Sequence, residues 1–72
     1  MEFTDHAIRR MRLRRVAILD VEFVLAATAE VVTHDHGTAS HFGWSIDGRR
    51  IVVVTEAEDY DRVVTVMIEE ER

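Results

Sequence analysis

The hydrophobic pattern changes its period halfway along the chain, and this change limits the fold more than any other feature. Up to about residue 28, apolar residues recur at helical spacing, as Ala7, Ile8 and Met11 do. From Val31 onward, apolar and β-branched residues alternate or run together, which is typical of strands. Helices first and hairpin-linked strands afterwards predict an α+β fold, with two N-terminal helices on one face of an antiparallel sheet of about four strands.

The first half predicts helices over residues 5–14 and 18–28. Thr4 is placed to cap the first of them, and Asp5 in its first turn suits the helix dipole. No Gly or Pro separates the two segments, so a single long bent helix is the alternative.

The second half predicts strands and turns. In the segment from Phe42 to Ile46, Phe42, Trp44 and Ile46 alternate with smaller or polar residues, so these three are predicted to face the core. The other expected elements are a strand from Val31 to a turn at 36–37, a hairpin turn at 47–48, a central strand over 51–55, a loop over 58–61, a last strand over 63–68 and a frayed tail over 69–72.

The length of 72 residues predicts one domain covering 1–72. The chain has no Cys, which excludes disulfides and thiolate metal sites and fits a reducing compartment. The first residues lack the pattern of a signal peptide, and no apolar run is long enough to span a membrane. We therefore expect a cytoplasmic protein with no membrane partner.

The net charge of −5 hides an uneven distribution. Residues 1–15 hold five of the nine basic residues, all Arg, against two acids. An Arg cluster in an otherwise acidic chain favours one defined anionic partner, either nucleic acid or an acidic protein. The alternative is a solvated helix face without a partner.

The opening segment, read as H-A-x-x-R-M-x-x-R over residues 6–14, resembles a family of small bacterial domains of unknown function that is grouped with the RelE and BrnT toxins. The later segments 48–55 and 64–66 agree with it in order. Arg15 stands where that family usually has Gly, and the acidic charge departs from the basic character usual in RelE-like nucleases.

The resemblance implies a RelE-like fold and a toxin of a toxin–antitoxin pair that acts as a small, metal-independent endoribonuclease. It places the catalytic site at His6, Arg10, Arg14 and Thr65, and we expect Arg9, Arg12 and Tyr60 to contact RNA. It implies no cofactor. The expected partners are a cognate antitoxin and RNA, in some cases ribosome-bound, and a homodimer is left open.

Two other functions compete with this hypothesis. The first is a non-catalytic interaction module of the same fold that binds a protein partner, which the acidic balance favours. The second is a zinc site formed by His34 and His36 with His41 across the hairpin, although polar residues gather at turns without any metal.

Overall fold

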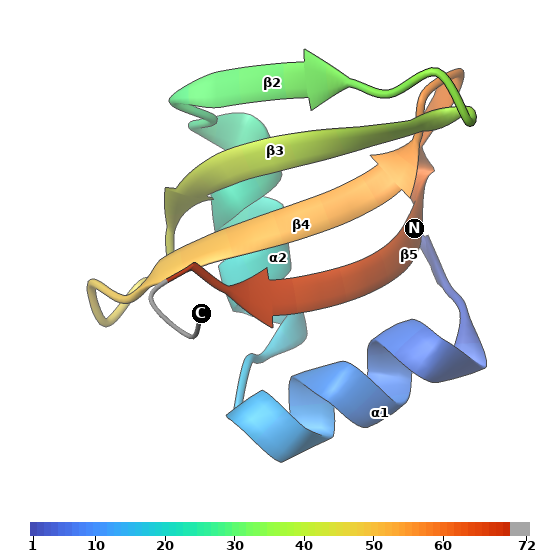
Figure 1. Cartoon of the computed structure of the whole chain (residues 1–72). Helices are drawn as coiled ribbons and strands as arrows, with labels where there is room; N and C mark the ends of the chain where they lie inside the picture. Colours follow the sequence, from blue (N-terminus) through green and yellow to red (C-terminus); the bar gives the residue numbers. More distant parts are fainter. Residues whose placement is uncertain (70–72) are drawn as a thin grey trace.

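The described residues fold into two helices packed against a mixed five-stranded sheet. The computed structural model describes residues 1–69, so residues 70–72 of the expected tail over 69–72 lie outside the described residues, while Glu69 is held by its amide hydrogen bond to the Arg50 carbonyl at 2.9 Å. The elements in order are β1 (Glu2–Phe3), α1 (Asp5–Arg14), α2 (Ile18–Ala26), β2 (Glu30–Thr33), β3 (Thr38–Trp44), β4 (Arg50–Glu56) and β5 (Asp59–Ile68). The strand order in the sheet is β1-β5-β4-β3-β2 (Figure 1).

The α+β class is confirmed, but the sheet differs from the predicted four antiparallel strands. β1 adds a fifth strand that runs parallel to β5, with Phe3 opposite Val63. A strand of two residues is too short to show an alternating pattern, so its sequence does not distinguish it from a loop. β4 lies between β3 and β5, as expected for the central strand.

α1 has the predicted bounds because its ends carry local signals. The Thr4 hydroxyl accepts a hydrogen bond from the Ala7 amide at 3.0 Å and donates one to the Val64 carbonyl at 2.8 Å. The helix ends at Arg15, which adopts the left-handed conformation with φ 55° and breaks the path toward α2. Two helices form, and the single bent helix does not.

α2 ends at Ala26, two residues before the predicted end. The Thr28 hydroxyl donates to the Val24 carbonyl at 2.6 Å and takes the acceptor that another helical turn would use. Of the helices in residues 1–69, none is long and apolar enough to cross a membrane.

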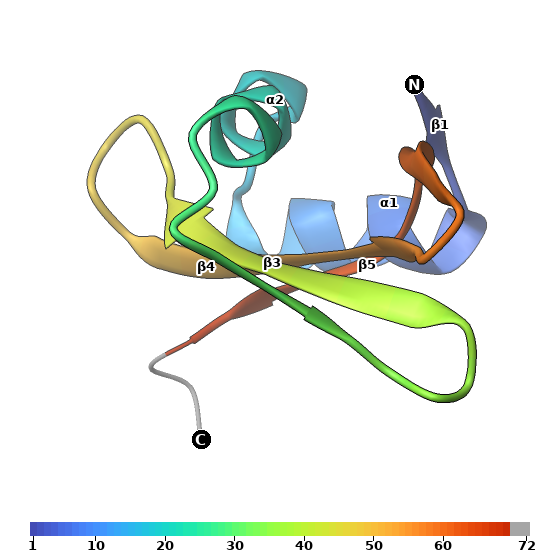
Figure 2. The same ribbon diagram turned by 90° about the horizontal axis from the view of Figure 1, so that it is seen from above.

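One hydrophobic core lies between the helices and the sheet. α1 packs along β5, while α2 crosses β3 and β4 and stands off one face of the sheet (Figure 2). Buried side chains from both helices, from the segment between them and from the two strands β4 and β5 meet there: Ala7, Met11, Val16, Val21, Val24, Ile51, Val53, Val63, Val66 and Ile68.

The prediction that Phe42, Trp44 and Ile46 face the core is wrong. Trp44 is 48% exposed and Ile46 63% exposed, whereas His41 and Ser45 are each only 2% exposed. The reason is Gly43, where an added Cβ would lie 3.2 Å from a Val24 methyl group. α2 approaches the sheet at this glycine, so the residues in phase with Gly43 turn inward and Trp44 turns away.

The predicted loop over 58–61 is also too long. β5 begins at Asp59, so Tyr60 lies in a strand and not in a loop. Strand pairing shifts by one residue between Val54 and Thr55, which leaves Val64 as a bulge. The turns predicted at Gly37 and Gly48 are present, and both glycines have the positive φ that such turns require.

Candidate functional site

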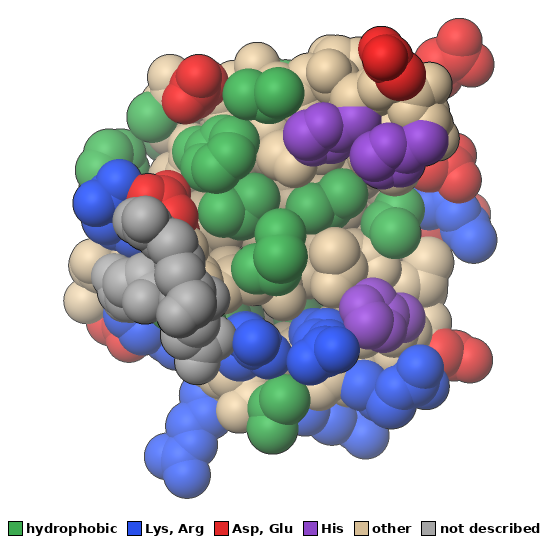
Figure 3. Space-filling view, viewed as in Figure 1, with side chains coloured by type: hydrophobic (Ala, Val, Ile, Leu, Met, Phe, Trp, Pro, Cys, Tyr) green, Lys and Arg blue, Asp and Glu red, His purple; other side chains and the backbone are tan. Residues whose placement is uncertain are grey.

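Among residues 1–69, no helix covers one face of the sheet, which we call the open face. Strand register places Ser40, Val54 and Thr65 in one row of this face. Phe42, Val52 and Met67 form the next row. Figure 3 shows hydrophobic side chains in the middle of this face and Arg and His side chains bordering it below, on the side where α1 lies.

α1 presents two different flanks beside its buried residues Ala7 and Met11. At about 3.6 residues per turn, one flank carries His6, Arg10 and Arg14, and we call it the His6 flank. The opposite flank carries Ile8, Arg12 and Arg15, and we call it the groove flank because these residues line a groove with the start of α2. The groove flank faces the start of α2, and α2 lies on the covered face of the sheet. The His6 flank is on the opposite side of α1 and therefore turns toward the open face.

The His6 flank and Thr65 border the same region. α1 packs against β5, and Thr65 projects from β5 on the open face, opposite Val54. Arg10, Arg14 and Thr65 are half-buried, while His6 is exposed. The structure therefore brings the four residues predicted to be catalytic to one border of the open face.

The residues predicted to bind RNA do not join this border. Arg9 is exposed on the outer side of α1, and Arg12 belongs to the groove flank. Tyr60 contacts His41 on the opposite face of the sheet, with ring centroids 4.4 Å apart and planes at 85°. Trp44, which was predicted to be core, lies exposed on the open face instead.

His34 and His36 form a pair on the β2–β3 turn. Their rings stack with centroids 5.3 Å apart and planes at 10°. Each ring also contacts a hydroxyl at 2.8 Å, His34 that of Ser40 and His36 that of Thr38. His41 faces the other side of the sheet, so it does not complete a three-histidine site, and no cluster of three metal-ligating side chains occurs within residues 1–69.

His41 is a buried polar residue, and the sequence pattern did not predict that it belongs to the core. Its Nε2 lies 2.8 Å from the Thr55 hydroxyl oxygen, and that hydroxyl donates to the Glu56 carbonyl at 3.1 Å. The tautomer of His41 decides whether Nε2 or the Thr55 hydroxyl donates in this contact. Burial lowers the pKa of His41 below its ordinary value.

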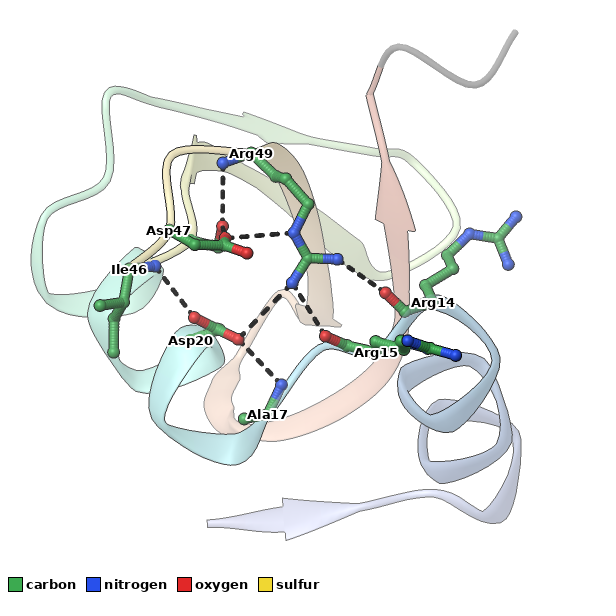
Figure 4. A network of polar contacts seen from close by, with 8 residues as sticks. Arg14, Arg15, Ala17, Asp20, Ile46, Asp47 and Arg49 are labelled. Atoms are coloured by element: carbon green, nitrogen blue, oxygen red, sulfur yellow. Dashed lines mark hydrogen bonds and ion pairs between the residues drawn. The ribbon is translucent and has the colours of Figure 1, made fainter.

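Arg49 holds the end of α1. Its guanidinium donates to the backbone carbonyl oxygens of Arg14 and Arg15 at 2.7 and 2.8 Å (Figure 4). Carbonyls at the end of a helix lack intrahelical donors, so Arg49 acts as a cap from a distant hairpin. It also donates to Asp47 at 3.1 Å, and the Ser45 hydroxyl and Arg49 together lower the pKa of Asp47.

Asp20 connects the same hairpin to α2. Its carboxylate accepts hydrogen bonds from the Ala17 and Ile46 amides, both at 2.9 Å, and lies 4.0 Å from Arg49 (Figure 4). Asp20 and Arg49 thus bind the end of α1, the start of α2 and the β3–β4 hairpin into one polar network. This network sets the orientation of α1 and therefore of both its flanks.

The fold and this border define a small α+β domain in which an Arg-rich helix flank adjoins an open sheet face. The chain belongs to the family described as "Domain of unknown function (DUF4258)", which matches residues 3–68. Comparisons with curated proteins and with solved structures gave no match.

Proposed function

We propose that this protein is a cytoplasmic RelE-like toxin that cleaves RNA without a metal ion and is controlled by a cognate antitoxin. The observation that carries the proposal is the meeting of His6, Arg10 and Arg14 with Thr65 at the border of the open face. The resemblance of residues 6–14 to the opening segment of families grouped with RelE and BrnT supports the same reading.

The residue types at this border suit phosphodiester cleavage. His6 takes the proton of the 2′-hydroxyl, whose oxygen forms a bond to phosphorus while the bond to the 5′ oxygen breaks. The departing 5′ oxygen takes its proton from water. Arg10 and Arg14 hold the phosphate oxygens and offset the charge that builds up on them, and Thr65 orients one of those oxygens.

The open face supplies a surface along which a single strand of RNA can lie. Trp44 is exposed there, and an aromatic ring offers a stacking platform for an unpaired base. Its exposure makes Trp44 a better candidate for stacking than Tyr60, which lies on the opposite face.

A non-catalytic interaction module is the second candidate. The net charge of −5 disfavours broad binding to nucleic acid. The open face also exposes Val32 and Met67 beside Trp44, an apolar set that a protein partner can cover. In this reading the Arg side chains receive carboxylates and no RNA is cleaved.

RNA cleavage in the presence of a chelator tests the proposal. End-labelled RNA is incubated with purified protein, alone and with ribosomes, and growth is followed after induction in a bacterial host. His6→Ala is expected to lower the cleavage rate by about 10²–10⁴-fold, as removal of a proton-transfer group does. His36→Ala is the matched control, since His36 is also exposed but lies on the distant β2–β3 turn.

Melting curves show whether both variants keep the fold. If the wild-type protein neither binds nor cleaves RNA and does not slow growth, the nuclease proposal is wrong. Equal loss of cleavage in His6→Ala and His36→Ala would also contradict the assignment of His6.

A further inference from the structure

The groove flank of α1 forms one side of an apolar groove of about 530 Å³. Phe3, Ile8 and Met11 contribute to it from β1 and α1, and residues 16–18 close it at the start of α2. Arg12 and Arg15 complete the lining, so the apolar surface lies directly beside two guanidinium groups. The groove lies on the opposite flank of α1 from His6.

The apolar surface continues along the outer side of α2. Ile18, Leu19 and Phe23 are 54%, 65% and 47% exposed, although α2 also buries Val21 and Val24 against the sheet. Apart from Glu22, the exposed residues of α2 are apolar, and such an outer side is typical of a helix covered on both sides. The outer side of α2 is therefore suited to a second packing partner.

In the described part of the chain, no ion pair joins Arg12 or Arg15 to a carboxylate. Arg49, Arg50 and Arg62, in contrast, pair with acidic side chains. Both are exposed at the rim of an apolar surface. A partner that covers the surface and carries carboxylates at its edge would satisfy both features.

We propose that the groove and the outer side of α2 bind an acidic amphipathic helix of a partner protein. Its apolar face would cover Ile8, Ile18 and Leu19, with side chains at the i, i+3, i+4, i+7 spacing of helix-in-groove recognition. Its carboxylates would pair with Arg12 and Arg15. This proposal does not depend on RNA cleavage and holds equally for the interaction module.

Two other occupants fit the surface less well. A symmetric dimer brings the same patch of both copies together, so Arg12 and Arg15 of both copies would enter one interface with Glu22 of each copy as the acidic residue of the patch, which leaves guanidinium groups in excess. A small anionic amphiphile would fill the groove but leave Leu19 and Phe23 uncovered, since neither residue lines the groove.

Selection from a phage-displayed library of helical peptides tests the proposal. The wild-type protein is the target and Ile18→Glu the counter-target, since Ile18 is exposed at the first residue of α2, where an acidic side chain suits the helix. Enriched peptides are expected to combine helically spaced apolar residues with a net negative charge. Leu19→Glu serves as a second counter-target if Ile18→Glu fails to fold.

A matched pair of charge reversals on α1 then tests the guanidinium contacts. Arg12→Glu is expected to weaken binding of an enriched synthetic peptide by about tenfold or more, as loss of a charged contact at an interface does. Arg9→Glu changes the net charge equally, but Arg9 lies outside the groove lining. It should alter the affinity for the peptide by less than about twofold, because an exposed charge away from the contact contributes little.

Four outcomes would overturn the proposal. They are no enrichment over the counter-target, enrichment of peptides without negative charge, an equal effect of Arg9→Glu and Arg12→Glu, and a wild-type dimer in sedimentation velocity that Ile18→Glu converts to a monomer. The last outcome would assign the surface to a second copy of this chain.

Discussion

The two flanks of α1 carry the same residue type but face different surroundings. On the His6 flank, Arg10 and Arg14 are half-buried next to β5 and the open face. On the groove flank, Arg12 and Arg15 are exposed beside apolar side chains from α1 and α2. One Arg-rich stretch of sequence therefore forms two separate cationic surfaces, because successive helical residues point in different directions.

Asp20→Ala is expected to have the largest effect and to disturb both flanks together. It removes the acceptor for the Ala17 and Ile46 amides and the carboxylate near Arg49. The loss of charged hydrogen bonds and of a helix cap should lower the free energy of unfolding by about 2–4 kcal/mol. Urea titration measures this change.

Glu22→Ala is the control on the same helix. Glu22 is exposed and forms no ion pair within residues 1–69, so its removal should shift the urea midpoint far less. If the two variants unfold at the same urea concentration, the polar network does not set the orientation of α1.

Arg10→Ala and Arg12→Ala should separate the two flanks in an RNA-binding assay. Arg10→Ala is expected to weaken binding about tenfold or more, since a charge-assisted hydrogen bond contributes about 1.5–3 kcal/mol. For this variant the slope of log affinity against log salt concentration should become shallower by about one, which is the contribution of one phosphate contact. Arg12→Ala removes the same charge on the other flank and should leave RNA affinity nearly unchanged.

Fluorescence anisotropy at several salt concentrations measures both variants. An equal loss in both would mean that α1 acts as one undivided basic patch, and the distinction between its flanks would fail.

Acidification should weaken the packing on the face of the sheet that α2 covers. Burial lowers the pKa of His41 from its ordinary value of 6.5, so the unfolded chain binds a proton at a higher pH than the folded chain does. The free energy of unfolding should therefore fall as the pH drops below about 6.5 and level off below the folded-state pKa.

Thermal melts between neutral and mildly acidic pH follow this change. His41→Gln, which retains a donor for Thr55, should lose most of the pH dependence in this range, whereas His36→Ala should retain it. A His41→Gln protein with the wild-type pH profile would show that another group causes the change.

Arg15→Gly should have the smallest effect and give opposite results in two assays. Arg15 adopts φ 55°, where Gly avoids the Cβ clash, so the free energy of unfolding should rise by about 0.5–1 kcal/mol. Affinity for the acidic helical peptides should fall, because the groove loses one guanidinium group. Arg9→Gly, inside α1, should instead destabilise the protein by about 1 kcal/mol.

Calorimetry and peptide titration test this pair of results. If Arg15→Gly lowers the melting temperature, the left-handed conformation at the end of α1 is not strained. If peptide affinity is unchanged, Arg15 takes no part in the groove.

The sequence by itself determined the features that depend on neighbours along the chain. The start of α1 follows from Thr4 and Asp5, and the turns follow from Gly37 and Gly48. The valine-rich segment at 51–54 identified the central strand, because residues covered on both faces of a sheet are apolar in succession. The grouping of His6, Arg10 and Arg14 follows from helical spacing alone.

Only the tertiary structure decided which surroundings these elements meet. β1 pairs with a strand about 60 residues away, as Glu2 opposite Arg62 shows, and no local pattern encodes that pairing. Trp44 is exposed because Val24 packs against Gly43 on the other side of β3, although alternation alone allowed either side to face inward. The direction of each α1 flank depends on Arg49 and its contacts with the Arg14 and Arg15 carbonyls. These features arise from contacts between residues far apart in the chain, which propensity and periodicity do not specify.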